Sequence, residues 1–132
     1  QFPFYAGIMA VMVDSGLAQQ ISRGFIAVAD ADSLPFFSFV SAGLVNMFVP
    51  SGGGQWAVQA PIVIPAAQEL GADISRVAMA VAWGDAWTNL IQPFWALPLL
   101  GITKLKAKEI LPYTLFAMFV GSVIYIFGIL LF

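Results

Sequence analysis

The sequence NMFVPSGGGQWAVQAP occupies residues 46–61 and places three consecutive glycines inside the longest uncharged stretch of the chain, residues 34–68. A single straight helix of these 35 residues would be about 52 Å long, whereas the hydrocarbon core of a bilayer is about 30 Å thick. Two arms, residues 34–49 and 56–68, would each be about 20–24 Å long, which suffices to reach mid-membrane and return. The length therefore predicts a re-entrant hairpin over residues 34–68, with its tip at residues 51–54.

The composition of the whole chain is that of a membrane protein. Its 132 residues are 61% hydrophobic and 9% charged, with a mean hydropathy of +0.92, whereas soluble domains carry about 25% charged residues. Three further windows, residues 2–22, 77–100 and 110–132, reach the length of about 20 apolar residues that crosses a bilayer. We predict an all-α membrane protein in which residues 2–22 and 110–132 are transmembrane helices and residues 77–100 form a broken one.

The start of the chain and its missing residue types narrow the possibilities further. The chain begins Gln-Phe-Pro at the edge of an apolar segment, without a basic leader, so we expect a piece of a longer protein; a processed small subunit is the alternative. With no Cys and no His, thiolate and imidazole chemistry are not available. The net charge of −2 gives no reason to expect a nucleic-acid partner.

The basic residues predict the orientation of the spans. Lys104, Lys106 and Lys108 crowd one short link, which the positive-inside rule places in the cytoplasm. A hairpin over residues 34–68 leaves Arg23 and Arg76 outside, whereas a single broken span puts Arg23 inside with the lysines. The charge count thus favours the single span by one residue, and the length argument favours the hairpin.

The tip of the hairpin is the first candidate site. Non-helical backbone at membrane depth is tolerated only when it is buried in protein or lines a wet cavity. If a helix restarts near Gln55, its N–H groups and positive dipole end point into that cavity and suit an anion. The alternative is a tight turn in which the glycines supply positive φ angles.

A second polar interruption lies in the segment GDAWTN, residues 84–89, followed by Gln92 and Pro93. Asp85 lies eight residues into its span, at a depth of about 12 Å, and an ionisable residue there is a functional candidate by default. The alternative is an Asp that only hydrogen-bonds a neighbouring helix. Two broken segments with polar tips at similar depth are typical of the midplane site of a secondary transporter.

The remaining polar and aromatic residues carry weaker signals. Asp14 precedes Ser15-Gly16 and either binds a cation or marks a kink. Asn46 and Gln59 are close enough to the glycines to face the same cavity. Trp56, Trp83, Trp87 and Trp95 are expected to be packing or interfacial residues. No metal cluster, phosphate loop or catalytic triad is present in the sequence, so we expect no enzyme and no metal site.

Two long motifs carry a resemblance to a known family. The stretches VPSGGGQWAVQAPIVIPAA and MAVAWGDAWTNLIQPFWALPLLGI, with the opening FPFYAGIM, resemble the C-terminal part of the short-chain fatty acid transporter family. The resemblance implies membership of the ion-transporter superfamily, in which two inverted repeats each supply a re-entrant hairpin and a broken helix. Residues 1–132 would then be the C-terminal transport-repeat fragment, and the rest of the transporter, a homodimer in its full form, would be a partner.

The resemblance also implies roles at the tip. Sodium symporters of that superfamily have a Ser-Asn-Thr signature where this chain has Ser51-Gly52-Gly53, so proton coupling through Asp85 competes with sodium coupling. Such a carrier needs no cofactor beyond Na⁺ or H⁺. A short aliphatic tail would favour an apolar pocket, which Trp87 or Phe94 would line.

These expectations combine into one functional hypothesis. It is secondary active transport of short-chain fatty acids or other monocarboxylates across the cell inner membrane by a multi-pass, lipid-embedded, cation- or proton-coupled carrier. A non-transporting structural subunit of a membrane complex is the alternative. The predicted substrate-binding residues are Ser51, Gly52, Gly53, Gly54, Gln55, Thr88, Asn89 and Gln92, and the predicted coupling residues are Asp85 and Asn46.

Overall fold

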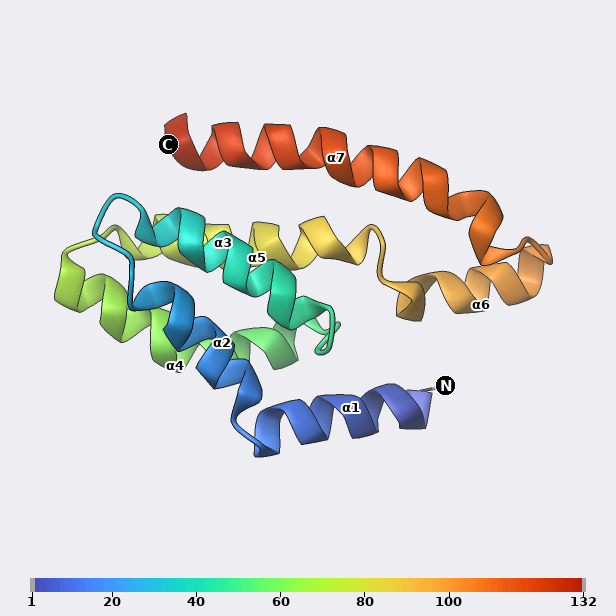
Figure 1. Ribbon diagram of the computed structural model, residues 1–132, viewed down its shortest axis with the longest axis horizontal. Coiled ribbons are helices and arrows are strands. Elements are labelled where there is room, and N and C mark those ends of the chain that lie inside the picture. The colour runs from blue at the N-terminus through green and yellow to red at the C-terminus, as the bar shows by residue number, and fades with distance from the viewer. Residues whose placement is uncertain (1, 132) are drawn as a thin grey trace.

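The computed structural model describes residues 2–131, and every regular element within them is an α-helix (Figure 1). The helices are α1 (Phe2–Asp14), α2 (Leu17–Ile26), α3 (Leu34–Asn46), α4 (Gly52–Leu70), α5 (Ile74–Asn89), α6 (Pro93–Thr103) and α7 (Ala107–Leu131). In Figure 1, helices α2 to α5 pack together in one half of the molecule, α1 and α6 lie toward the other, and α7 runs along both.

The centre of the fold is a close parallel pair formed by α3 and α5. Its small residues let the two backbones approach: a Cβ added at Gly84 would overlap the carbonyl oxygen of Phe39 and lie 2.8 Å from the Cβ of Ala42. A Cβ added at Gly43 would lie 2.8 Å from the Trp87 ring. Contacts this close between helices rich in small residues are the usual packing mode where no water drives association.

Helices α3 and α4 run antiparallel, joined by residues 47–51. Leu34, at the start of α3, shares a buried apolar cluster with Ala67 near the end of α4 and Val77 at the start of α5. Ile26, the last residue of α2, packs against the same cluster. The end of α2, the start of α3, the end of α4 and the start of α5 therefore meet at one end of the molecule.

Three interruptions of the helices lie close to one level. The break between α1 and α2, at Gly16 with a φ of 74°, is flanked by Met12 and Ala18, which share a buried cluster with Val45 and Val49 beside the α3–α4 link. The break between α5 and α6 reaches the same link, because Gln92 Nε2 donates to the carbonyl oxygens of Asn46 and Met47 at 3.3 and 3.0 Å. The helices are thus interrupted at three places that lie at a similar depth in the fold.

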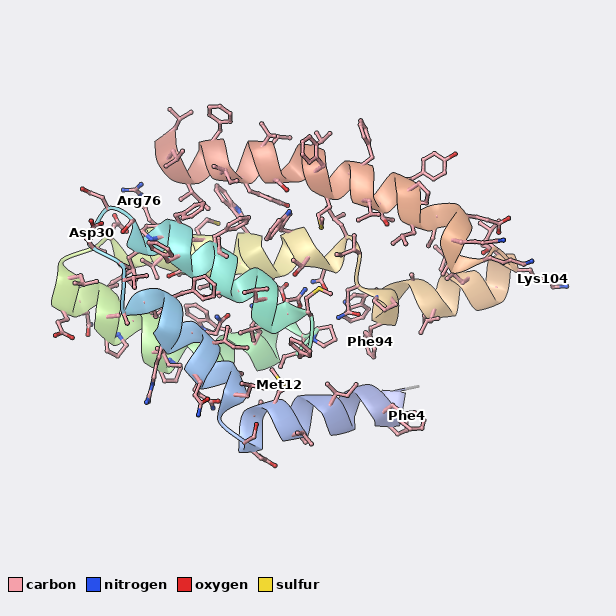
Figure 2. All side chains as sticks on the ribbon, in the orientation of Figure 1. Phe4, Met12, Asp30, Arg76, Phe94 and Lys104 are labelled. Carbon is pink, nitrogen blue, oxygen red and sulfur yellow. The ribbon has the colours of Figure 1, made fainter. Side chains whose placement is uncertain are left out.

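The opposite ends of the molecule are marked by loops of different charge (Figure 2). At one end, Asp30 Oδ1 accepts from both the backbone N–H and the hydroxyl of Ser33, at 2.9 and 2.6 Å, and these bonds lower the pKa of Asp30. At the same end Asp73 caps α5 by accepting from the N–H groups of Ser75 and Arg76. Lys104 lies at the far end in Figure 2, where α6 stops.

Helix α7 is, among residues 2–131, the one helix long and apolar enough to cross a membrane. Its 25 residues make it about 37 Å long. Trp87 Nε1 donates to Ser122 Oγ at 2.7 Å and so fixes α7 beside α5. The outer face of α7 is apolar and exposed, since Phe116, Phe119 and Phe127 have 60–71% of their surface accessible. Apolar surface of this extent marks contact with lipid or with another part of a protein.

The helices agree with the predicted segments in kind and differ in their ends. Residues 77–100 contain a helix break, at the turn before Gln92, and residues 110–131 lie within α7. Residues 2–22 are not one helix, because left-handed Gly16 divides them and leaves two pieces too short to span a membrane alone. The kink interpretation of Asp14 fits this geometry, since Asp14 is the exposed last residue of α1.

Candidate functional site

The glycines of the predicted tip form the first turn of α4. The helix restarts at Gly52, three residues earlier than the predicted Gln55, because Ser51 caps it in an extended conformation. Ser51 Oγ accepts from Gly54 N at 3.4 Å, and the Ser51 carbonyl accepts from Gln55 N at 2.7 Å. Gly16 and Gly71 are the positive-φ glycines among the described residues, so the tight-turn alternative for the tip is wrong.

Two backbone donors remain open at this helix start. The N–H groups of Gly52 and Gly53 make no hydrogen bond within residues 2–131, and both residues are exposed. A Cβ added at Gly53 would meet nothing within 4 Å. Because the first N–H groups of a helix lack intrahelical partners and carry its positive dipole end, the turn offers two donors to an anion.

Asp85 lies against this turn from the side of α5. A Cβ added at Gly52 would lie 3.7 Å from Asp85 Oδ2, and the same oxygen accepts from Asn89 Nδ2 at 3.2 Å. Neither α3 nor α4 carries a basic residue, and the one on α5, Arg76, lies more than two helical turns away along that helix. The half-buried carboxylate therefore has no basic side chain on these three helices close enough to pair with it.

The predicted residues Asn46, Thr88 and Gln92 are engaged in holding the helices together. Asn46 Nδ2 lies within 2.9–3.1 Å of three acceptors, namely Asp85 O, Thr88 Oγ1 and Asn89 Oδ1. Thr88 Oγ1 in turn donates to the Gly43 carbonyl at 2.9 Å. Gln92 ties the end of α3 to the start of α6, since its Oε1 accepts from Phe94 N. These three side chains set the position of Asp85 and Asn89 relative to α3.

A chain of buried hydrogen bonds holds the Gln55 side chain in place on α4. It was not predicted from the sequence. Gln55 Nε2 donates to the Ala42 carbonyl and to Gln59 Oε1, both at 2.9 Å. Gln59 Nε2 donates onward to Ser22 Oγ at 3.0 Å and lies 3.3 Å from Ser41 Oγ. The i, i+4 spacing of the two glutamines signals a shared helix face. Gln59 therefore points into the packing of α2, α3 and α4, and the cavity expected for it lies elsewhere.

Three buried acceptor oxygens at the site lack a donor. They are Asn46 Oδ1, Gln55 Oε1 and Asp85 Oδ1, one each from α3, α4 and α5. Buried polar atoms are nearly always satisfied in folded proteins, so each of these needs a water, a proton or a cation as partner. Within residues 2–131 there is no cluster of three or more His, Cys, Asp or Glu side chains that could hold a metal ion.

A pocket of about 360 Å³ lies between α4 and α5. Gly52, Gln55 and Asp85 line it at the level of the helix break. Of the predicted substrate-binding residues, Gly52 and Gln55 line this cavity, and Asn89 lies next to it through its hydrogen bond to Asp85. Thr88 and Gln92 are buried behind them, 6% and 3% exposed.

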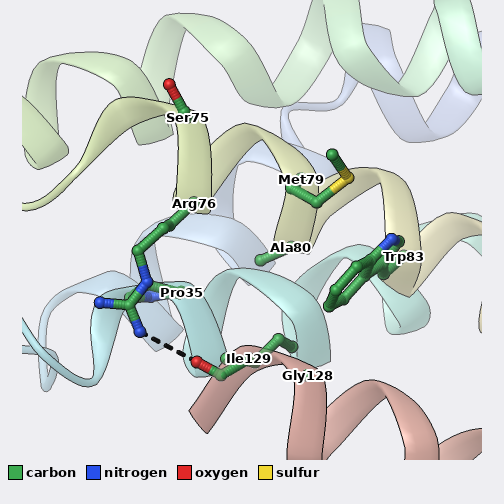
Figure 3. Close-up of a pocket in the computed structure, with 8 residues that line it drawn as sticks. All are labelled: Pro35, Ser75, Arg76, Met79, Ala80, Trp83, Gly128 and Ile129. Carbon is green, nitrogen blue, oxygen red and sulfur yellow. Dashed lines mark hydrogen bonds between the residues drawn. The ribbon is translucent and has the colours of Figure 1, made fainter. Parts of the chain in front are cut away.

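A second pocket, of about 210 Å³, lies between α5 and α7 at the opposite end of α5 (Figure 3). Arg76 Nη2 donates to the Ile129 carbonyl at 2.9 Å across it. A basic side chain at a helix C-terminus is favourable to the helix dipole. The arrangement ties α7 to α5, and Trp83, on the pocket wall in Figure 3, has the packing role expected of it.

Comparison with known proteins agrees with the resemblance in the motifs. The family model described as "Short chain fatty acid transporter" matches residues 1–132. A protein of Escherichia coli (strain K12), named "Putative short-chain fatty acid transporter", is 50% identical over 132 residues. One of the same name from Haemophilus influenzae (strain ATCC 51907 / DSM 11121 / KW20 / Rd) is 49% identical over 129 residues.

The matches cover a much larger share of this chain than of the two relatives. They cover 100% and 98% of this chain but 30% and 29% of the two relatives, so the chain spans about a third of their length. No solved structure matches. The chain belongs to the short-chain fatty acid transporter family.

Proposed function

We propose that this chain is the C-terminal part of a secondary carrier that moves short-chain monocarboxylates across the cytoplasmic membrane. Family membership and the names of both relatives support the substrate class. The observation that carries the proposal is the meeting of open N–H donors at the start of α4 with the Asp85 carboxylate, which has no basic partner on α3, α4 or α5. Binding and transport, rather than covalent catalysis, suit a site without a nucleophile–base pair.

The architecture that fits this function is a re-entrant hairpin of α3 and α4 beside a broken helix of α5 and α6. Support comes from the antiparallel course of α3 and α4 and from the helix breaks that lie at one depth. Secondary transporters bind substrate where discontinuous helices from two repeats meet near the midplane. The remainder of the carrier would supply the other, inverted repeat, and the full protein would be a multi-pass homodimer.

The carboxylate of the substrate would bind at the first turn of α4. The N–H groups of Gly52 and Gly53 would donate to its oxygens, with Ser51 and Gly54 fixing the turn. The absence of a side chain at Gly52, where an added Cβ would lie 3.7 Å from Asp85 Oδ2, lets an anion approach the backbone closely. An anion held by a helix start needs no Lys or Arg, which agrees with the uncharged sequence of this segment.

Asp85 explains why such transport would be coupled. A substrate carboxylate at Gly52 would lie beside the Asp85 carboxylate, and two like charges sharing a site repel strongly unless one is neutralised. A proton on Asp85 or a sodium ion among the unpartnered oxygens of Asn46, Gln55 and Asp85 would remove that repulsion. Oxygen donors of this kind suit hard cations. Binding of the cation and of the anion would then favour each other.

The test is uptake by the full-length carrier in proteoliposomes under a proton or a sodium gradient, each imposed separately. We expect wild-type protein to accumulate butyrate and Asp85→Asn to lose uphill accumulation, because Asn keeps the shape but binds neither a proton nor a cation well. Asp14→Asn, at the exposed end of α1, is the matched control and should accumulate normally.

Two results would contradict the proposal in different ways. Normal accumulation by Asp85→Asn under the coupling gradient would remove Asp85 from the mechanism. Absence of saturable uptake and of counterflow in the wild-type carrier, with correct insertion, would favour the non-transporting structural subunit.

A further inference from the structure

The pocket between α4 and α5 changes in character along its length. Gly52 and Asp85 line it at the helix break, and Ala78, Val81 and Ala82 line it further along α5. Residues 78, 81, 82 and 85 have the i, i+3, i+4, i+7 spacing of a single helix face. The pocket therefore has one polar end and one apolar wall, both built on α5.

The polar end includes a side chain that points to a ligand. Gln55 is 1% exposed and lines the pocket, yet its Oε1 has no hydrogen-bond partner. Gln55 Nε2 donates to two acceptors, the Ala42 carbonyl and Gln59 Oε1. Exchanging the positions of the amide nitrogen and oxygen would place Oε1 against these acceptors, so the amide keeps its orientation. This buried acceptor needs a water or a cation as partner, and the open N–H group of Gly52 offers a donor to a carboxylate, so the polar end of the pocket has unused capacity for both.

The apolar end is bounded by small side chains on one side and by an indole on the other. Ala82 is exposed and Ala78 is half-buried, and Trp56 on α4 faces the same pocket with 38% of its surface exposed. The aromatic residues expected to line an apolar pocket, Trp87 and Phe94, are not among those that line this one. Trp87 stacks on Phe39 instead, with ring centroids 5.0 Å apart.

The dimensions of the pocket suit a short aliphatic tail. From Asp85 to Ala78 the helix rises about 10 Å, and an extended alkyl chain advances by about 1.3 Å per carbon, given bonds of about 1.5 Å. An apolar cavity of about 150 Å³ accommodates benzene, which has six heavy atoms. The pocket of about 360 Å³ has room for the six heavy atoms of butyrate and for longer tails.

We propose that Ala78, Ala82 and Trp56 select the substrate by the length of its tail. The inference rests on the proposed function: with the carboxylate at the start of α4, the alkyl chain lies along Ala82 toward Ala78 and against Trp56. The small alanine side chains leave the room that the tail fills. Enlarging Ala82 removes the space nearest the head group, and removing the Trp56 ring extends the space at the side.

The experiment compares uptake of acetate, butyrate and hexanoate by the full-length carrier in proteoliposomes. For Ala82→Leu we expect the preference for butyrate over acetate to fall about tenfold or more, since one methylene in an apolar pocket changes discrimination by about 10–200-fold. Trp56→Ala should shift the preference in the opposite direction, toward hexanoate. Ala57→Leu, at an exposed position that does not line the pocket, is the matched control and should leave the order unchanged.

The outcomes separate this inference from the function on which it rests. Wild-type uptake with the same relative preference in Ala82→Leu and Trp56→Ala as in wild type would overturn the selection by tail length and leave the carrier function standing. Equal changes in Ala57→Leu and Ala82→Leu would also overturn it. No uptake of any carboxylate by the wild-type carrier would overturn both.

Discussion

Gly84 is the residue on which the close approach of α3 and α5 depends. The carbonyl oxygen of Phe39 and the Cβ of Ala42 occupy the space that a side chain at residue 84 would need. Gly101 is the useful contrast, because a Cβ there would meet nothing within 4 Å and the residue is exposed. The difference between the two glycines is therefore one of packing rather than of backbone conformation.

We expect Gly84→Ala to lower the stability of the full-length carrier in detergent by about 1–3 kcal/mol, the usual cost of overpacking a well-packed core. Gly101→Ala should leave the stability unchanged or raise it by up to about 1 kcal/mol, since Ala is the better helix former and meets no clash there. Thermal unfolding monitored by size-exclusion or fluorescence measures both variants. Equal midpoints for Gly84→Ala and wild type would show that the α3–α5 contact is looser than the structure has it.

Side-chain pairing is also the part of the site that sequence could not supply. The candidate residues Ser51 to Gln55 and Asp85 to Gln92 follow from their polarity inside apolar segments. Their partners do not, since Asn46 reaches Thr88 only when α3 and α5 are parallel and in register. The Gln59–Ser22 bond requires a third helix, α2, whose packing no spacing in the sequence reveals.

At the scale of the helices, the pair α3 and α4 determines which loops share a side of the membrane. If the pair is re-entrant, the loop before α3 and the loop after α4 lie on the same, outer side. Asp32 lies in the first of these loops, and Glu69 is the residue before the last one of α4. Both are exposed and, unlike Asp73, cap no helix. Lys108 lies in the first turn of α7, next to the basic link that is expected in the cytoplasm.

We expect single cysteines at Asp32 and at Glu69 to react with an impermeant thiol reagent added outside intact cells. A cysteine at Lys108 should react only after the cells are opened. The chain itself contains no Cys, so any native cysteines of the remaining carrier are to be replaced first. Labelling of only one of the first two positions from outside would mean that residues 34–70 cross the membrane once.

Helix α7 is the element whose function as a span can be tested on its own. Phe119 lies at its middle and is 70% exposed, so in a bilayer it faces lipid or another part of the carrier. An Asp at the centre of a transmembrane helix costs about 2.5–3.5 kcal/mol on insertion scales. Phe119→Asp should therefore reduce the membrane-inserted fraction of the carrier, and Phe119→Leu should not.

The readout for α7 is the amount of inserted carrier that resists carbonate extraction, normalised to synthesis. Equal insertion of the Asp and Leu variants would place Phe119 outside the hydrocarbon, and the assignment of α7 as a span would then be wrong.

Residues 2–22 show that composition alone does not identify a span. They had the composition of a span, yet left-handed Gly16 divides them, and composition alone does not register that break.

At the scale of the whole molecule, the uncharged stretch and its glycines were enough to predict an interruption near residue 51. The residue at which α4 begins was not predictable, because it depends on the hydrogen bond that Ser51 Oγ accepts from Gly54 N and not on the helix propensity of glycine. The level at which the three breaks meet was also beyond the sequence, since it is set by contacts between segments more than 25 residues apart, such as Met12 and Val45.

The broad apolar surface of the molecule suits burial against lipid or against further protein. Exposed aromatic and aliphatic side chains cover α1, α6 and α7, with Phe4 81%, Trp95 56% and Phe127 60% exposed. Lipid and the remaining two thirds of a carrier of the relatives' length together would cover them. Transport is accordingly a property to be measured on the full-length protein in a membrane.

A short-chain carboxylate bound at the first turn of α4 would shield a thiol placed there from a labelling reagent. Gly53→Cys is suited to carry that thiol, since a side chain at residue 53 meets nothing within 4 Å. In the full-length carrier without other cysteines, butyrate should slow the labelling of Gly53→Cys in a saturable manner, whereas sulfate should not. Labelling of Gly101→Cys should be unaffected by either anion. An identical labelling rate of Gly53→Cys with and without saturating butyrate would contradict the account.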